Sequence, residues 1–193
     1  MLSSDAARQM FWVCLMENGA AGGTYGANGI WQVNRRDAAY GPSPHGRSWG
    51  SQPWDEAMSR PGSAQVGLAK RFFARYPWQN LAPRPQAAAW ADEQPAKDES
   101  NPSAVGTGTE RSAGVSPAGA AGTAAVRCII YVPRPRPIVV KDLAPGAEYS
   151  AGEFDPVSGE YSPGGTIKAD ANGTWRCPPP GYKHDWVVIL EKR

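Results

Sequence analysis

The stretch between residues 22 and 50 gathers the side chains that are best suited to hold a ligand. It reads GGTYGANGIWQVNRRDAAYGPSPHGRSWG and has neither helical nor alternating periodicity. Flat aromatic rings bind the apolar faces of small molecules, while amide and guanidinium groups bond their polar groups. The same rings could instead pack the stretch onto the rest of the protein, so ligand binding and packing both stay open. The rings in question are those of Tyr25, Trp31, Tyr40, His45 and Trp49.

Metal and cofactor chemistry finds little support in the residue types. The three cysteines, Cys14, Cys128 and Cys177, lack CxxC spacing, and two histidines cannot complete a standard zinc site with them. We therefore expect no metal and no cofactor. A disulfide between Cys128 and Cys177 is one alternative, and three free thiols are the other, which we favour.

The charge balance argues against partners that are recognised by bulk electrostatics. Lysine and arginine number 20 against 18 acidic residues, which gives a formal net charge of +2. We expect neither nucleic acid nor a membrane as a partner, since no apolar run approaches the roughly 20 residues of a membrane-spanning helix. The first residues lack a signal-peptide pattern, and localisation stays open.

Residues 1–91 have the pattern of an α/β layer. Ser3, Ser4 and Asp5 precede an apolar-periodic run and predict a capped helix. The later elements follow from glycine and proline positions and from helical spacing. In order, the pattern predicts a helix at 6–18, one buried strand at 22–26, a loop at 27–52, a helical turn that begins at Pro53 and a helix at 62–76.

Residues 92–126 have the composition of a disordered linker. They contain no aromatic residue and few large apolar ones. Burial therefore cannot offset the ~1–2 kcal/mol per residue that backbone ordering costs. A Ser/Thr/Pro-rich stalk for glycans is the weaker alternative.

Residues 127–193 have the punctuation of a small antiparallel β-sandwich. Short β-branched or aromatic runs alternate with Pro, Gly, Asn and Asp. Asn172-Gly173 predicts a two-residue hairpin turn. The run 186–190 is apolar on both faces, which is typical of a central strand. Three aromatic side chains could build either the core or an exposed ligand platform: Phe154, Tyr161 and Trp186.

Several motifs resemble one family of glycoside hydrolases. These are AAGGTYGANGIWQ, then GPSPHGRSWGSQPWDEAMSRPGSAQVGLAKRFFARYPW, and after a gap FDPVSGEY and DWVVILE. Together they are similar to the carboxyl-terminal part of the apiosidase-like glycoside hydrolases (DUF4038), over about residues 5–90 and 127–191. The resemblance implies the end of a catalytic (β/α)8 barrel, followed by a sandwich that carries the label of a collagen-binding domain of a collagenase.

The resemblance also implies a role for the aromatic stretch. Active sites of (β/α)8 barrels are built by loops that leave the carboxyl ends of the strands. A strand at 22–26 would make 27–52 such a loop, and its rings would line a sugar-sized pocket. Packing of the loop onto the barrel stays the alternative. The residues then expected to bind substrate are Tyr25, Trp31, Gln32, His45 and Trp49.

The carboxylate pair that a glycoside hydrolase uses is not evident in the sequence. Glu17 ends its helix on the side opposite the active-site face, and Asp5 is better suited to cap the same helix. We therefore name no catalytic residue and expect the chain alone to be inactive. The resemblance implies a truncated carboxyl-terminal fragment of an enzyme that hydrolyses glycosidic bonds in polysaccharides.

Such a fragment would have two kinds of partner: a carbohydrate, met through the parent enzyme, and an upstream fragment that completes the barrel. With one barrel strand, some helix faces would lack the sheet they were shaped to cover. The alternative function is a non-catalytic sandwich that binds carbohydrate or protein, or that supports a barrel. The side chains expected to be left uncovered are Phe11, Trp12, Phe72 and Phe73.

Overall fold

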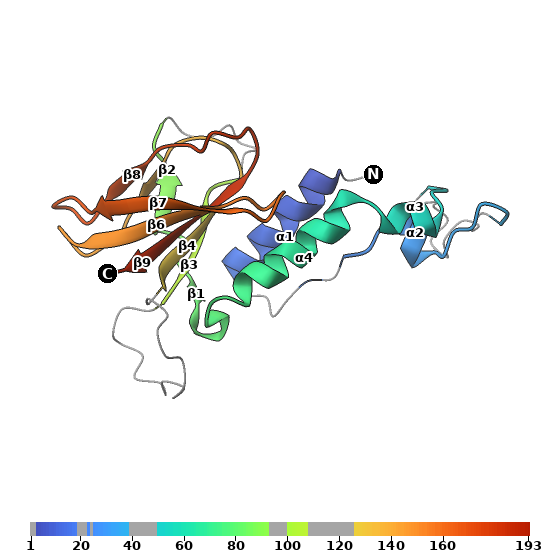
Figure 1. The fold of residues 1–193 in the computed structure, drawn as a ribbon, viewed down its shortest axis with the longest axis horizontal. Helices are drawn as coiled ribbons and strands as arrows, with labels where there is room; N and C mark the ends of the chain where they lie inside the picture. Colours follow the sequence, from blue (N-terminus) through green and yellow to red (C-terminus); the bar gives the residue numbers. More distant parts are fainter. Residues whose placement is uncertain (1–2, 19–22, 24, 39–49, 93–99, 108–125) are drawn as a thin grey trace.

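The protein consists mainly of antiparallel sheets, with two long helices against one sheet face (Figure 1). The computed structural model describes residues 3–18, 23, 25–38, 50–92, 100–107 and 126–193. Its helices are α1 (Ser4–Asn18), α2 (Asn28–Trp31), α3 (Trp54–Met58) and α4 (Pro61–Phe73), with a 3-10 turn η1 at Trp78–Asn80. Its strands are β1 (Ala82–Pro83), β2 (Ala88–Trp90), β3 (Ser103–Gly106), β4 (Val126–Val132), β5 (Ile138–Val140), β6 (Glu148–Phe154), β7 (Tyr161–Lys168), β8 (Trp175–Cys177) and β9 (Trp186–Lys192).

Three helices, α1, α3 and α4, begin within two residues of the predicted positions, whereas α2 lies inside the segment 27–52 that was predicted to be a loop. The Ser3 hydroxyl accepts a hydrogen bond from the Ala6 amide at 3.1 Å, which caps α1. Pro61 stands in the first turn of α4, where its missing amide hydrogen costs nothing. In Figure 1, α1 and α4 lie side by side.

The strands form two sheets. The larger sheet has the order β1-β3-β4-β9-β6-β7, and the smaller has the order β2-β5-β8. All pairings are antiparallel. The prediction that the run 186–190 is a central strand is confirmed, because β9 pairs with β4 on one side and β6 on the other.

Two apolar cores lie on the two faces of the six-stranded sheet. Trp186, Val188 and Leu190 of β9 belong to the core between the two sheets. Val187 and Ile189, which point the other way, belong to the core between the large sheet and the helices. The strand alternation therefore joins the sandwich and the helices into one packed body.

The expectation of uncovered helix faces is wrong for α1 and α4. Trp12 is fully buried and Phe72 nearly so, while Phe11 and Phe73 are half-buried. The sheet that covers them belongs to the sandwich, which the sequence analysis treated as a separate unit. Because β4, β6 and β9 are apolar on their second face, they supply the burial surface that a barrel sheet was expected to supply.

Part of the expected linker is a strand. Ser103–Gly106 pairs with both β1 and β4, and all four residues have low exposure. A Cβ atom on Gly106 would lie 2.5 Å from the Arg127 carbonyl oxygen, so the close approach requires glycine. Composition missed β3 because neighbouring strands provide its hydrogen bonds and cover its small side chains. Residues 93–99 and 108–125 of the expected linker lie outside the described residues.

Two local predictions are also corrected. Among the described residues of the expected strand at 22–26, namely 23, 25 and 26, none is in a strand. Asn172-Gly173 does form a turn, and Gly173 has a φ of 71°. That turn connects β7 to β8, which lie in different sheets, so it is not a hairpin. Asp170 closes the turn by accepting hydrogen bonds from the amides of Asn172 and Thr174, both at 2.8 Å.

The structure also bears on the two alternatives left open for the aromatic residues of the sandwich, a core or an exposed platform. Trp186 and Phe154 are buried, but in different cores, whereas Tyr161 is 44% exposed. These three rings therefore form neither a common core nor a common platform. Cys14, Cys128 and Cys177 are free thiols, as favoured from their spacing.

Candidate functional site

Residues 25–38 and 50–60 form a small helical unit that holds three of the predicted ligand-binding residues, Tyr25, Trp31 and Gln32. The Asn34 amide nitrogen donates to the carbonyl oxygens of Gly50 and Gln52, both at 3.2 Å, and the Trp54 amide donates to the Asn34 carbonyl at 2.9 Å. A Cβ atom on Gly29 would lie 2.4 Å from the Gln52 carbonyl oxygen. Glycine at position 29 is therefore what lets α2 and α3 come together.

The described candidates have different environments. Trp31 is 84% exposed, so one ring face is free to stack on a ligand. Gln32 is buried, and its amide oxygen accepts no hydrogen bond within the described part of the chain. Tyr25 is half-buried, and its ring lies against Gly62 of α4. The structure thus places Trp31 at the end of α2, Gln32 in the turn that follows, and Tyr25 against α4. His45, Trp49 and the further loop ring Tyr40 lie outside the described residues.

The acidic groups of this unit are paired with arginines. Arg36 bonds Asp55 and Glu56, the latter at 2.8 Å, and Arg35 bonds Asp37. The hydrogen bond from Arg36 lowers the pKa of the Asp55 carboxyl. A general acid needs the opposite shift, so this carboxyl is unsuited to protonate a leaving group.

All five acidic residues of the first 80 have a side-chain partner, which is an arginine for four of them and a serine for Glu17. Glu17 accepts a hydrogen bond from the Ser103 hydroxyl at 2.8 Å, and Asp5 pairs with Arg8 at 2.9 Å. Asp5 therefore does not cap α1, which Ser3 does instead. Glycosidases keep two carboxyl groups on either side of the scissile bond. The paired acids of this region do not form that arrangement.

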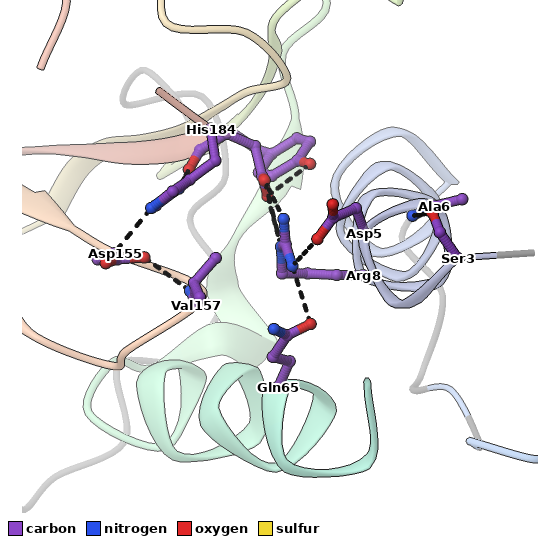
Figure 2. A network of polar contacts seen from close by, with 10 residues as sticks. Ser3, Asp5, Ala6, Arg8, Gln65, Asp155, Val157 and His184 are labelled. Atoms are coloured by element: carbon purple, nitrogen blue, oxygen red, sulfur yellow. Dashed lines mark hydrogen bonds and ion pairs between the residues drawn. The ribbon is translucent and has the colours of Figure 1, made fainter. Parts of the chain in front are cut away.

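A buried polar network joins the helices to the sandwich, and sequence reasoning missed it. The Arg8 guanidinium reaches from α1 toward Gln65 of α4 (Figure 2), whose amide oxygen accepts its hydrogen bond at 2.8 Å. The same group bonds both carboxylate oxygens of Asp185, which also accepts from the Tyr131 hydroxyl at 3.0 Å. Arg8 and Asp185 are 1% and 0% exposed, so this pair is removed from water.

The network is saturated, which favours a structural role over a chemical one. Burial acts to lower the pKa of Arg8, but the hydrogen bond and charge of Asp185 outweigh it and raise the pKa. Burial and the nearby Asp185 carboxylate raise the pKa of the Tyr131 hydroxyl. Both side chains therefore keep their protons. One signal in the sequence could have revealed the network: Arg8 is spaced by four and eight residues from Trp12 and Met16 on the buried face of α1.

Metal binding and membrane crossing find no support in the described ranges. Within them, His, Cys, Asp and Glu side chains do not gather in threes that could hold a metal ion. None of the helices in those ranges has both the length and the apolar character that crossing a membrane requires.

Comparison with known proteins finds a family match for part of the chain and a fold likeness over the whole of it. Residues 1–80 match the family model of the apiosidase-like catalytic domain. No curated protein matches the chain in sequence. The fold is similar to that of a solved glycoside hydrolase, with a TM-score of 0.71 and 20% identity over 100% of this chain and 37% of that chain. It is also similar to a glycoside hydrolase family 5 from Bacteroides vulgatus ATCC 8482, with a TM-score of 0.70 and 18% identity over 99% of this chain and 36% of that chain.

The chain thus spans little more than a third of the length of these two structures. At such low identity the likeness shows a shared fold, while the family match rests on residues 1–80. The apiosidase-like glycoside hydrolase relationship that the sequence motifs predicted is therefore confirmed for this chain through its first 80 residues.

Proposed function

We propose that this chain is the carboxyl-terminal part of an apiosidase-like glycoside hydrolase that, when complete, hydrolyses glycosidic bonds in polysaccharides. The observation that carries the proposal is the catalytic-domain match over residues 1–80. The part of the known folds that this chain does not cover supports the view that further polypeptide completes the enzyme.

In this proposal the chain contributes to substrate binding rather than to bond cleavage. The exposed ring of Trp31 offers a stacking face for a sugar. Gln32, the next residue, is buried, and its amide oxygen accepts no hydrogen bond from the described residues, so it would need a rearrangement of the loop to reach a ligand. Tyr25, His45 and Trp49 remain part of the same proposed site. The catalytic carboxyl groups come from elsewhere in the complete enzyme, because the acids of the first 80 residues are engaged with other side chains.

A second function, support of the catalytic domain by the sandwich, is favoured by the buried network. Arg8 and Gln65 belong to the family-matched region, whereas Asp185 and Tyr131 belong to the sandwich. The aromatic core under α1 and α4 connects the same two parts. In this view the sandwich fixes the positions of α1 and α4 and does not itself bind a ligand.

The enzyme proposal is tested by extending the reading frame upstream and assaying the extended protein on a panel of glycosides. We expect turnover by the extended protein and none by the chain alone. Trp31→Ala should lower kcat/KM by at least about tenfold, the effect of losing roughly 1.4 kcal/mol of binding. Trp78→Ala, at a 48% exposed tryptophan outside the unit, is the control. Turnover by the purified chain that persists in Asp5→Asn and Glu17→Gln variants would refute the proposal.

A further inference from the structure

The outermost strand of the six-stranded sheet is long enough to pair with a further strand. This strand, β7, ends the order β1-β3-β4-β9-β6-β7 and is eight residues long. Within the described chain its backbone pairs only with β6. The other outer strands are shorter, since β1 has two residues and β2 and β8 have three each. Because the unpaired amide and carbonyl groups of an outer strand can bind a strand of another chain, β7 is the edge most open to association.

A proline stands in the middle of this edge. Pro163 lies opposite Gly152 of β6, and β7 is paired with β6 on both sides of it. A proline nitrogen carries no hydrogen, so it cannot donate to a carbonyl oxygen of a neighbouring strand. Sheets tolerate proline in an outer strand where its nitrogen faces away from the paired strand, or next to a bulge. The donor that is missing at Pro163 is therefore one that a further strand on the outer side would need.

The residues after this proline form a bulge. The register passes from Ala151↔Gly165 to Gly152↔Pro163, so Gly164 has no partner in β6. Gly165 has a φ of 84°, a conformation that residues with a side chain rarely adopt. A bulge bends its strand and increases the local twist. A straight strand of another chain could therefore not follow β7 through this bend.

The bend leaves two short pieces of the edge that can pair regularly. Every residue of β7 except Ile167 is exposed, and Ile167 packs against the core between the two sheets. The residues on either side of the bend are Tyr161, Ser162, Thr166, Ile167 and Lys168. Neither piece is longer than the short outer strands of the other edges. The edge is thus open to solvent, but it offers no continuous row of backbone donors.

The strand that this edge would otherwise bind is β7 of a second copy of the chain. Two copies of one edge can pair about a twofold axis, which makes the two strands antiparallel. In such a pair Glu160, directly before β7 of one copy, would lie near Lys168 at the end of β7 of the other. Opposite charges on facing strands favour pairing. Without the proline and the bulge, the edge would therefore be complementary to itself.

We propose that Pro163 and the bulge at Gly164 and Gly165 block β7 from pairing with β7 of a second copy. The block keeps the six-stranded sheet from extending from one molecule into the next. The other outer strands need no such block, because two or three residues provide little backbone to pair. This property of the fold is independent of the proposed enzymatic function.

The test restores a regular edge and measures whether it pairs. The variant combines Pro163→Val with deletion of Gly164 in the full chain. Hydrogen exchange followed by mass spectrometry gives the exchange rate of the β7 amides at rising protein concentration, and light scattering gives the mass. We expect exchange in this variant to slow at least about tenfold and the mass to double, because pairing protects the outward-facing amides. In the unsubstituted protein the exchange rate of β7 should not depend on concentration.

Two further variants keep the test decisive. Pro145→Val is the matched control, since Pro145 is an exposed proline in the turn before β6, and it should behave like the unsubstituted protein. Pro163→Val alone keeps the bulge and serves if the deletion prevents folding. It should slow the exchange of β7 by about threefold, because it restores the missing donor but not the straight strand. A cooperative thermal melt identifies the variants that are folded.

Three results would overturn the proposal. In the first, folded Pro163 variants exchange their β7 amides at a rate that does not depend on concentration. In the second, β7 of the unsubstituted protein becomes protected as the protein is concentrated, which would mean that the edge is already open to pairing. In the third, protection of a Pro163 variant appears in β2 or β8 and not in β7, which would place the contact at another edge.

Discussion

Replacing Trp12 by alanine should destabilise the whole protein, although Trp12 lies in the helical part and the predicted sandwich lies far along the sequence. The indole is fully buried between α1, α4 and the six-stranded sheet. Its ring is stacked on Tyr131 at 5.6 Å between centroids and lies 5.4 Å from Phe72. It is also 6.2 Å from Phe154. A change at Trp12 therefore removes contacts to one helix and two strands at once.

The size of the effect follows from these contacts. Truncating a buried tryptophan to alanine costs about 3–5 kcal/mol. The Trp12 ring nitrogen is buried without a described partner, so its removal breaks no hydrogen bond. We therefore expect a loss of about 4 kcal/mol, which for a protein of this size lowers Tm by about 8–16 °C.

The assay is a pair of thermal melts followed by circular dichroism and calorimetry. Trp186→Ala removes an equally buried ring from the core between the sheets and should shift the same single transition. Trp78→Ala, at an exposed position, should change the free energy of unfolding by less than about 0.5 kcal/mol. Two separate transitions, one moved only by Trp12→Ala and the other only by Trp186→Ala, would refute the view that the two cores form one body.

Three further outcomes are expected. Asp185→Asn should cost about 3–5 kcal/mol in urea unfolding, because it removes the buried anion of Arg8 and leaves that charge with only the exposed carboxylate of Asp5. Asp37→Asn, at an exposed pair, should cost under about 0.5 kcal/mol. Equal costs would contradict this reasoning. Gly106→Ala should lower the free energy of unfolding by about 1–3 kcal/mol, because the added Cβ would meet the Arg127 carbonyl oxygen. Gly26→Ala, whose added Cβ would have no atom within 4 Å, should be nearly neutral in the same urea unfolding experiment. Burial raises the pKa of the Cys128 and Cys177 thiols to about 12. Because the folded protein holds these protons more tightly than the unfolded chain, the free energy of unfolding is unaffected below pH 9. It then falls by about 1.4 kcal/mol per pH unit for each thiol as the pH rises from 9 to 12. Urea unfolding at pH 7.5 and 10.5 measures the loss of unfolding free energy between these two pH values. This loss should be smaller in Cys128→Ala than in the unsubstituted protein and unchanged in Cys14→Ser. An unchanged loss in Cys128→Ala would exclude the Cys128 thiol as its cause.

The parts of the fold that sequence predicted well are those with local signals. The capped first helix, the proline-led α4 and the six strands after residue 126 each depend on caps, spacing or alternation within one short segment. The two-faced apolar pattern of 186–190 even indicated the central position of β9, because a strand covered on both sides needs apolar residues on both.

The misses concern segments whose structure is decided by distant partners. β3 has the sequence Ser-Ala-Val-Gly, with a single β-branched residue, and becomes a strand because β4 and β1 flank it. The burial of Trp12 depends on the second face of β4, β6 and β9, which no local pattern in α1 reveals. The candidate site was half predictable: composition singled out Trp31 and Gln32, but not the pairing of each nearby acid with an arginine.

The buried network bears on where one unit of this protein ends and the next begins. A boundary between domains normally falls where few contacts cross. Here a charged pair that is removed from water crosses it, together with an aromatic core. Removing one member of such a pair leaves an uncompensated charge in the interior. Separating the two parts would in addition expose the apolar faces of α1 and α4 to water. The helices α1 and α4 therefore need the sandwich for their own burial. This dependence is the physical basis for proposing that the sandwich supports a catalytic domain and is not an independent binding module.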